Sequence, residues 1–289
     1  MAKARQIVKR RKAVTNIRKI TKTMQLIATA RFQQAYNRAV ASKPYTQKIT
    51  QLVQELSAAT AGTIDHPLMK EFPDAKSDLM LVLTSNRGLC GGYNASVLRK
   101  AVAHLNASGR PVELFVVGKK GNAYFRFMRR NVNRAITHID DRPRFEQVEP
   151  LAQEFMQRYE AGEFGAVYVT YMRFISTGKQ APEVVRLLPL SKGAEEEPKK
   201  SGPTVLYEFS PNPEQLLGKL LPQTVKARLF QTFTDMAVSE QVARMVAMKA
   251  ATDAAGDMIK LLSRSFNRAR QSQITMELLD IVGCAEALK

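Results

Sequence analysis

The two ends of this chain lack the residues that interrupt helices. Residues 1–61 contain no glycine and a single proline, Pro44, and residues 223–289 contain no proline and only two glycines, Gly256 and Gly283. Apolar residues in both stretches recur at intervals of three, four or seven, which is the period of an amphipathic helix. Each end therefore predicts one long helix. At about 1.5 Å per residue, a helix of about 60 residues would extend roughly 90 Å, too far to be buried within one domain of this chain.

Each predicted helix has an apolar stripe that needs covering. The N-terminal stripe is made of Ile7, Val14, Ile17, Ile20 or Thr21, Met24, Ile27 or Ala28, and Ala35. The C-terminal stripe is made of Val225, Leu229, Met236, Val242, Met245, Met248, Met258, Leu261, Leu262 and Phe266. The simplest arrangement is a long antiparallel coiled coil of the two ends, with the segment between them carried at one end of the pair. The four methionines of the C-terminal stripe, Met236, Met245, Met248 and Met258, are interpreted as core residues.

The usual marks of a disulfide, metal or membrane-spanning protein are also missing. The only cysteines are Cys90 and Cys284, which fits a reducing compartment without a disulfide framework. The three histidines are scattered, and neither a CxxC nor an HExxH pattern is present. The apolar runs are too short to span a bilayer. The basic start lacks the apolar core of a secretory signal, and its helical period continues into the first helix, so we interpret it as part of the mature fold.

Acidic residues are scarce in the first helix. Residues 1–60 hold 13 Lys or Arg against one acid, Glu55, and so contribute +12 of the net charge of +18. A basic helix of this kind predicts an acidic counterpart, which could be nucleic acid, anionic lipid or an acidic protein surface. Composition alone does not choose among the three.

The central part of the chain alternates between apolar runs and helical patterns. Residues 61–78 are predicted to be a linker. The expected strands are 79–85, 112–118, 166–174, 184–190 and 204–209, and the expected helices are 94–106, 119–130 and 148–159. This alternation is typical of an open, Rossmann-like α/β domain. The predicted domains are thus an N-terminal helix (1–60), the linker, an α/β domain (79–209) with a mobile loop at 191–203, and a C-terminal helix (210–289).

No motif for catalysis or nucleotide binding accompanies this domain. The glycine-rich turn NRGLCGG (86–92) follows the first strand, but it matches neither GxGxxG nor the P-loop, and no GxSxG is present. We interpret the turn as structural and Cys90 as a small buried residue, with a reactive thiol as the alternative. Asp140–Asp141 and residues 195–197 are interpreted as exposed, solvated acids. The sequence therefore predicts no catalytic residue, no cofactor and no metal.

Four stretches carry a more specific signal. They are VTNIRKITKTMQLIATARF (14–32), TSNRGLCGGYNAS (84–96), SEQVARMVAMKAATDAAGDMI (239–259) and FNRARQSQITMELLDIVGCAEAL (266–288). Together they resemble the γ subunit of the proton-translocating F-type ATP synthase, in the right order and over essentially the whole chain. The pattern ITxExxDxxG, formed by Ile274, Thr275, Glu277, Asp280 and Gly283, is specific to that family.

The resemblance implies a role for the predicted architecture. The coiled coil would be the central shaft of a hexamer of alternating α and β subunits, with the α/β domain at its foot. One copy of the chain would turn with the membrane c ring and force the catalytic sites of the β subunits through their states. Its partners would be the α, β and ε subunits and the c ring; it would bind no nucleic acid and meet the membrane only through partners. The resemblance implies a place at the cytoplasmic face of a bacterial inner membrane; a mature organellar chain is the alternative.

The resemblance also implies contact residues at matching positions. Contacts with the β subunit loops, or polar contacts that hold the shaft to the hexamer, are expected from Lys22, Met24, Arg244, Lys249, Arg268, Arg270, Gln271, Thr275 and Glu277. Contacts with the c ring and the ε subunit are expected from Tyr207 and Glu208. The chain departs from the family at Asn86, Tyr93 and Cys284, where aspartate, leucine and a small residue are usual.

A second class of function competes with this interpretation. The basic first helix also fits a coiled-coil adaptor that binds nucleic acid or an acidic protein surface. However, basic residues are interspersed with the apolar stripe, and an α/β domain separates the helices, whereas a leucine-zipper protein places its basic region before a strict heptad seam. A stand-alone enzyme lacks catalytic residues to name.

Overall fold

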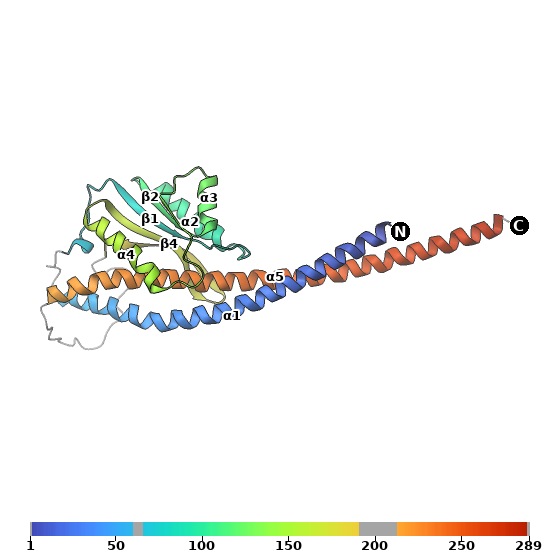
Figure 1. Cartoon of the computed structure of the whole chain (residues 1–289), viewed down its shortest axis with the longest axis horizontal. Coiled ribbons are helices and arrows are strands. Elements are labelled where there is room, and N and C mark those ends of the chain that lie inside the picture. The colour runs from blue at the N-terminus through green and yellow to red at the C-terminus, as the bar shows by residue number, and fades with distance from the viewer. Residues whose placement is uncertain (1, 60–65, 191–212, 288–289) are drawn as a thin grey trace. The chain divides into compact units, whose positions relative to one another are not determined.

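The computed structural model describes residues 2–59, 66–190 and 213–287, with side chains for 5–56, 66–190 and 215–284 (Figure 1). The chain divides into two compact units. The paired-helix unit combines Met1–Ala30 with Arg244–Lys289, and the α/β unit comprises Arg31–Ala243. Two long helices, α1 (Ala2–Ala59) and α5 (Pro213–Ala287), each contribute residues to both units. Pro44 and Pro222 lie inside these helices, where each removes one backbone hydrogen bond.

The α/β unit contains a five-stranded sheet in the order β3-β2-β1-β4-β5. The strands are β1 (Ser77–Leu83), β2 (Val112–Val117), β3 (Arg134–Ile136), β4 (Phe164–Ser176) and β5 (Lys179–Leu188). The first four are parallel, and β5 runs antiparallel to β4. The helices between them are α2 (Tyr93–Ala107), α3 (Lys119–Phe127) and α4 (Phe145–Glu160), and a 3-10 turn, Pro67–Met69, precedes the sheet. The predicted open α/β domain is confirmed.

The strand order explains which helices cover which face. The chain moves outward from β1 to β2 to β3 and then returns to β4 on the other side of β1. Right-handed crossovers therefore place α2 and α3 on one face of the sheet and α4 on the opposite face (Figure 1). Every residue of β1 from Asp78 to Leu83 is buried, as expected of a central parallel strand covered on both faces.

Helix α5 supplies a large part of the core of the α/β unit. Its buried residues recur at every fourth position and lie in the same cluster as the strands and α4. They are Leu217, Leu221, Val225, Leu229 and Phe233. Helix α1 adds Val53 and Leu56 to this cluster. The first part of α5 thus belongs to the core of the sheet domain.

Two elements differ from the sequence predictions. Strand β3 was not predicted, because three residues, one of them Arg134, give no apolar run to detect. Strand β5 begins at Lys179, five residues earlier than predicted, because its first half pairs with β4 and is only half-buried. The predicted strand 204–209 and the predicted loop 191–203 lie outside the described residues.

Small side chains, together with Met248, form the buried seam of the paired-helix unit. Thr21 and Ala28 of α1 are buried, as are Met248, Thr252 and Ala255 of α5. The Thr252 hydroxyl donates to Met248 O (2.8 Å) and lies 2.8 Å from the Thr21 hydroxyl. The alternatives left open in the sequence are therefore settled in favour of Thr21 and Ala28.

The large aliphatic residues of that predicted stripe are outside the seam. Ile17, Ile20 and Ile27 of α1 and Met258 of α5 are about half exposed. Leu261 of α5 is 60% exposed as well. The expected packing of Ile17 and Leu261 in the stripes, and of Met258 in the core, was wrong, since small residues let the two backbones approach closely and leave the larger side chains on the outside. An exposed aliphatic surface on a slender helix pair needs another protein to cover it.

Candidate functional site

The turn after β1 is filled by its own side chains. Asn94 Oδ1 accepts from the Ser85 backbone amide at 3.0 Å, and Asn94 Nδ2 lies 3.3 Å from Cys90 Sγ. Cys90 is buried, which confirms the structural interpretation of this residue. The Ser85 amide is therefore already paired within the chain, and the turn is built as a folded structure.

The side chain of Asn86 also holds the turn after β1 in place. Its side-chain amide donates to Thr137 O (3.1 Å), Ile139 O (3.1 Å) and Asp140 Oδ1 (2.9 Å), and its Oδ1 accepts from the Lys119 backbone amide (3.1 Å). An aspartate here could not make the three donor contacts. The departure from the resembled family at this position thus has a defined structural role.

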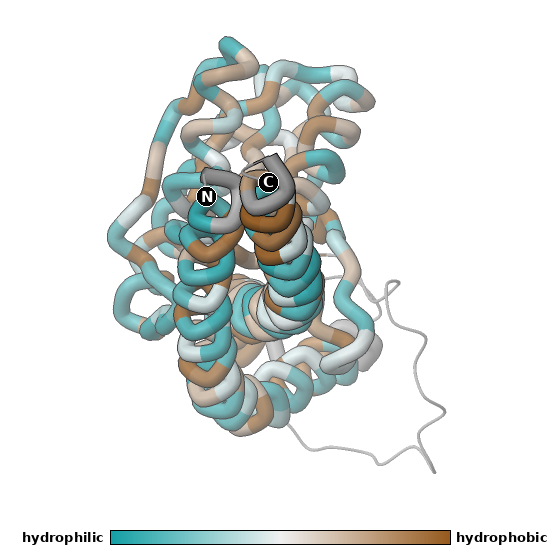
Figure 2. The backbone as a smooth tube through the Cα atoms, turned by 90° about the vertical axis from the view of Figure 1, so that its right-hand side faces the viewer, coloured by the Kyte–Doolittle hydropathy of each residue, from teal (hydrophilic) through white to brown (hydrophobic). Residues whose placement is uncertain are grey.

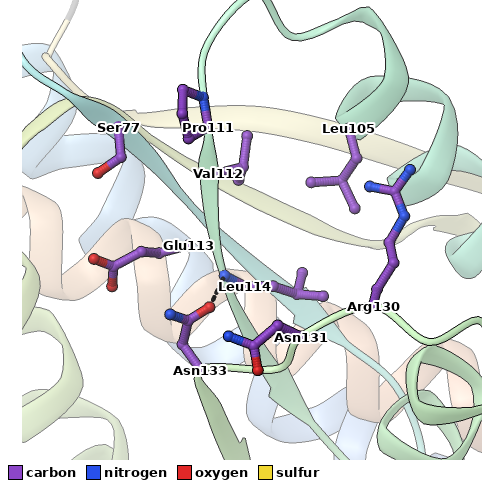
Figure 3. Close-up of a pocket in the computed structure, with 9 residues that line it drawn as sticks. All are labelled: Ser77, Leu105, Pro111, Val112, Glu113, Leu114, Arg130, Asn131 and Asn133. Atoms are coloured by element: carbon purple, nitrogen blue, oxygen red, sulfur yellow. Dashed lines mark hydrogen bonds between the residues drawn. The ribbon is translucent and has the colours of Figure 1, made fainter.

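A groove of about 390 Å³ lies at the opposite end of the sheet (Figure 3). It is lined by the amino ends of β1 and β2 and by residues before β3, whereas open α/β sheets bind ligands at the carboxyl ends of their strands. Three of its polar groups are already paired: Asn133 Oδ1 accepts from the Leu114 amide, Arg130 donates to Asn106, and Glu113 accepts from Arg158. The groove offers little chemistry for a small-molecule ligand. Among the described residues, no group of three His, Cys, Asp or Glu side chains could hold a metal ion.

The contact residues predicted on α1 lie in the paired-helix unit. Lys22 is exposed, and its ammonium group lies 3.5 Å from Gln25 Oε1. Met24 is half-buried. Around them, residues 5–30 of α1 contain no acid, and their exposed cations are Arg5, Lys9, Arg10, Lys12, Arg18, Lys19 and Lys22. The helix therefore presents positive charge and exposed aliphatic groups together.

The contact residues predicted on α5 divide into one buried and six exposed side chains. Arg244 is only 7% exposed, so its side chain lies mostly within the chain itself. The exposed residues are Lys249, Arg268, Arg270, Gln271, Thr275 and Glu277. Of these, Thr275 donates to Gln271 O (3.0 Å), and Glu277 accepts from Gln273 (2.8 Å). Both bonds lie within α5 itself. Tyr207 and Glu208 lie outside the described residues.

The sequence reading missed an apolar surface near the end of α5. Six large hydrophobic side chains in nine residues are 48–65% exposed: Ile274, Met276, Leu278, Leu279, Ile281 and Val282. Figure 2 shows this segment as brown coils close to the C-terminus. The available signal was the density of apolar residues after residue 273, on more than one side of the helix.

The interpretation of Asp141 as a solvated acid was wrong. Its side chain is 13% exposed, and its carboxylate pairs with Arg31 at 2.6 Å. Asp140, by contrast, is exposed as predicted. Residues 195–197 lie outside the described residues.

The comparisons with known proteins agree over the whole chain. The ATP synthase family model matches residues 3–288. The ATP synthase gamma chain of Rhodopirellula baltica is 44% identical over 296 residues, covering 100% of both chains, and that of Leptospira biflexa is 39% identical over 291 residues with the same coverage.

Solved structures match the fold at low identity. The Euglena gracilis mitochondrial ATP synthase rotor, in rotational state 1, aligns with a TM-score of 0.64 at 17% identity and covers 94% of this chain and 99% of that chain. A chain of the OSCP/F1/c-ring structure of the same enzyme gives a TM-score of 0.67 at 17% identity, covering 99% of this chain and 95% of that one. None of the helices within the described residues is long and apolar enough to cross a bilayer.

Proposed function

Because the chain belongs to the ATP synthase γ chain family, we propose that it is the central rotor shaft that couples rotation of the membrane c ring to ATP synthesis and hydrolysis at the β subunits. The observation that carries this proposal is the 44% identity over the full length of a γ chain, with no part of either chain left over. The shaft would be formed by residues 1–60 and 210–289, and residues 79–209 would form the foot, with 61–78 as a linker.

The exposed surface of the paired-helix unit fits this role. The aliphatic side chains of residues 274–282 need a cover, which the inner walls of a hexamer of α and β subunits would provide. The face of α1 around Lys22, where residues 5–30 carry no acid, would attract acidic loops of the β subunits. Ion pairs between exposed groups contribute only about 0–1 kcal/mol each. Such contacts are weak enough to break and re-form as the shaft turns.

The predicted polar contacts would act in the same way. Arg268, Gln271 and Thr275 fall on one side of α5 by helical spacing, and Arg270 and Glu277 fall on the opposite side. Two β subunits could therefore be met at once. Lys249 and Met24 would add contacts nearer the foot, and Arg244 would act by holding the helix in place rather than by direct contact. Tyr207 and Glu208 would meet the c ring and the ε subunit.

The chain would couple the reaction without catalysing it. It is a subunit of a proton-transporting ATP synthase, and we propose that no catalytic residue is its own, in line with the filled turn after β1. Membership of the F1 sector makes it peripheral to the membrane. The relatives from Rhodopirellula and Leptospira favour the cytoplasmic face of a bacterial inner membrane. Nothing in the comparisons favours the nucleic-acid-binding adaptor.

The test is reconstitution with α and β subunits from the same source. We expect one copy of the chain to enter a single hexamer on size-exclusion chromatography and to stimulate ATP hydrolysis, while the chain alone hydrolyses none. A chain that elutes apart from the hexamer would contradict the proposal.

The predicted contacts are tested by charge reversal. Lys22→Glu should lower hydrolysis by the assembled complex, because a carboxylate would then face acidic loops. Lys48→Glu is the matched control, since Lys48 is also exposed on α1 but belongs to the α/β unit. Equal activities of the two variants would show that Lys22 does not contact the β subunits.

A further inference from the structure

A short loop between β3 and α4, residues 137–143, connects the sheet to both long helices. We call it the collar loop. All of its contacts described below lie within the α/β unit. At this level α1 and α5 face each other through small residues: Ala35, Ala39 and Val238 form a separate apolar cluster with Phe32 and Phe174. Apolar contact of this kind is non-directional. It holds the helices close but does little to stop them from turning against the sheet.

One carboxylate oxygen of the collar loop bridges the two helices. Asp141 Oδ2 accepts from Arg31 Nη1 of α1 at 2.6 Å and from Gln241 Nε2 of α5 at 3.0 Å. Gln241 is 1% exposed, so its amide is shielded from water. Beside this pair, Arg142 donates to Gln34 Oε1 of α1 at 2.8 Å. The adjacent loop residues Asp141 and Arg142 thus make three hydrogen bonds to the two helices, and each bond has a defined direction.

The other side of the collar loop is fixed to the sheet. The Asn86 side-chain amide donates to Thr137 O, Ile139 O and Asp140 Oδ1, and its own carbonyl accepts from the first amide of α3. Ile139 is buried in the main core. The loop is therefore held by the turn after β1 and by the core, and does not depend on the helices for its position.

A second contact holds α5 from the β4–β5 hairpin. The Ser239 hydroxyl donates to Met172 O at 3.1 Å, in a buried position. On α1, the ring of Tyr36 meets Phe174 edge to face at 5.9 Å. The helices are thus held by the hairpin as well as by the collar loop, and the collar loop joins both of them by hydrogen bonds to a single carboxylate oxygen.

We propose that the collar loop transmits torque between the α/β domain and the two long helices, with Asp141 as the positioning residue. The proposal rests on the rotor function proposed above. Directional bonds resist twisting, because a rotation of either helix moves Arg31 or Gln241 away from a fixed acceptor. Removal of this acceptor should leave the apolar contacts intact and make the connection softer.

The experiment compares Asp141→Ala with Glu154→Ala in the assembled complex. Glu154 forms an ion pair with Arg134 inside the α/β unit, between α4 and β3, and does not touch α1 or α5 through it. Torsional stiffness would be read from the angular fluctuations of a bead on the foot of a surface-held hexamer. The bead would be attached through Gly109→Cys, where an added Cβ meets no atom within 4 Å, in a chain with Cys284→Ser.

We expect Asp141→Ala to lower the torsional stiffness by about two-fold or more, and to lower the number of protons pumped per ATP. Glu154→Ala should match the wild type in both, and Asp141→Asn, which keeps a carbonyl acceptor for Gln241, should fall between. If Asp141→Ala does not fold, Gln34→Ala removes an exposed partner of the loop and should give a smaller loss in the same direction.

The outcomes separate the two proposals. A wild-type chain that does not assemble or pump overturns the rotor function, and the collar proposal with it. A wild-type chain that pumps, together with an assembled Asp141 or Gln34 variant of unchanged stiffness, overturns the collar proposal alone. A loss of stiffness equal in Asp141→Ala and Glu154→Ala also overturns it, because general loosening of the domain would then be the cause.

Discussion

Removal of the Asp141 carboxylate should also destabilise the isolated chain. In Asp141→Ala, the buried Gln241 amide loses its acceptor, which costs about 1–3 kcal/mol. The ion pair with Arg31 contributes less, because the Arg31 side chain is 32% exposed and solvent screens it; we take about 0.5–1 kcal/mol. The unfolding free energy should therefore fall by about 1.5–4 kcal/mol. Asp141→Asn keeps an acceptor for Gln241 and should lose about 1 kcal/mol or less.

Urea unfolding measures this difference. The chain has no tryptophan and eight tyrosines, so tyrosine fluorescence and far-ultraviolet circular dichroism are the two probes. Asp257→Ala is the control, since its ion pair with Lys260 is about three-quarters exposed on both sides and its removal should change the unfolding free energy by less than about 0.5 kcal/mol. If Asp141→Ala is no less stable than Asp257→Ala, the bridge between the helices does not stabilise the fold and the reasoning fails.

Three further predictions follow from single contacts in the α/β unit. Gly121→Ala would place a Cβ 2.6 Å from Thr84 Oγ1 and 2.8 Å from Val116 Cγ1, and should cost about 1–3 kcal/mol through overpacking, measured as a lower Tm. A Tm equal to that of the wild type would show that α3 moves freely. Asn86→Asp replaces a donor by a carboxylate facing Asp140 and two carbonyls, and should cost about 1–3 kcal/mol; adding Asp140→Asn should recover part of the loss, and no recovery would contradict the proposed repulsion. Burial raises the pKa of Asp235 to about 6, against the lowering effects of the Gln231 hydrogen bond and of Lys43 and Arg173, while Glu183 raises it further. Because the folded chain then binds the proton more tightly than the unfolded chain, this group's contribution to stability is present below the ordinary aspartate pKa of 3.8 and is lost as the pH rises through about 6. Asp235→Asn should therefore stabilise the chain more at pH 8 than at pH 4.5 in urea titrations, and an equal effect at both pH values would refute this assignment.

The sequence determined the large elements of this protein. The absence of glycine from residues 1–61 and the helical spacing of apolar residues predicted both long helices, and alternating apolar runs predicted the α/β domain. These signals are local, since the spacing of apolar residues within one continuous segment predicts whether it forms a helix or a buried strand. The family could be identified in the same way, because the motifs that carry it are continuous stretches.

Only the tertiary structure decided which residues face the partner helix and which face outward. Ile20 and Thr21 both fit the stripe, and so do Ile27 and Ala28. Hydrophobicity favours the isoleucines, but the close approach of two helices favours the smaller residues, and Thr252 meets Thr21 across the seam. Ile20 and Ile27 therefore remain on the outside of the helix pair, where a partner protein could cover them.

The same limit applies to polar groups. Asp140 and Asp141 are neighbours of equal chemistry, and nothing in the sequence separates an exposed acid from one that joins two helices. Arg31, Asp141 and Gln241 are far apart in the chain, and the fold brings them together because the loop after β3 is held by Asn86 and the buried Ile139. Periodicity records the environment of a residue relative to its own helix or strand, whereas a bridge of this kind depends on where three distant segments meet.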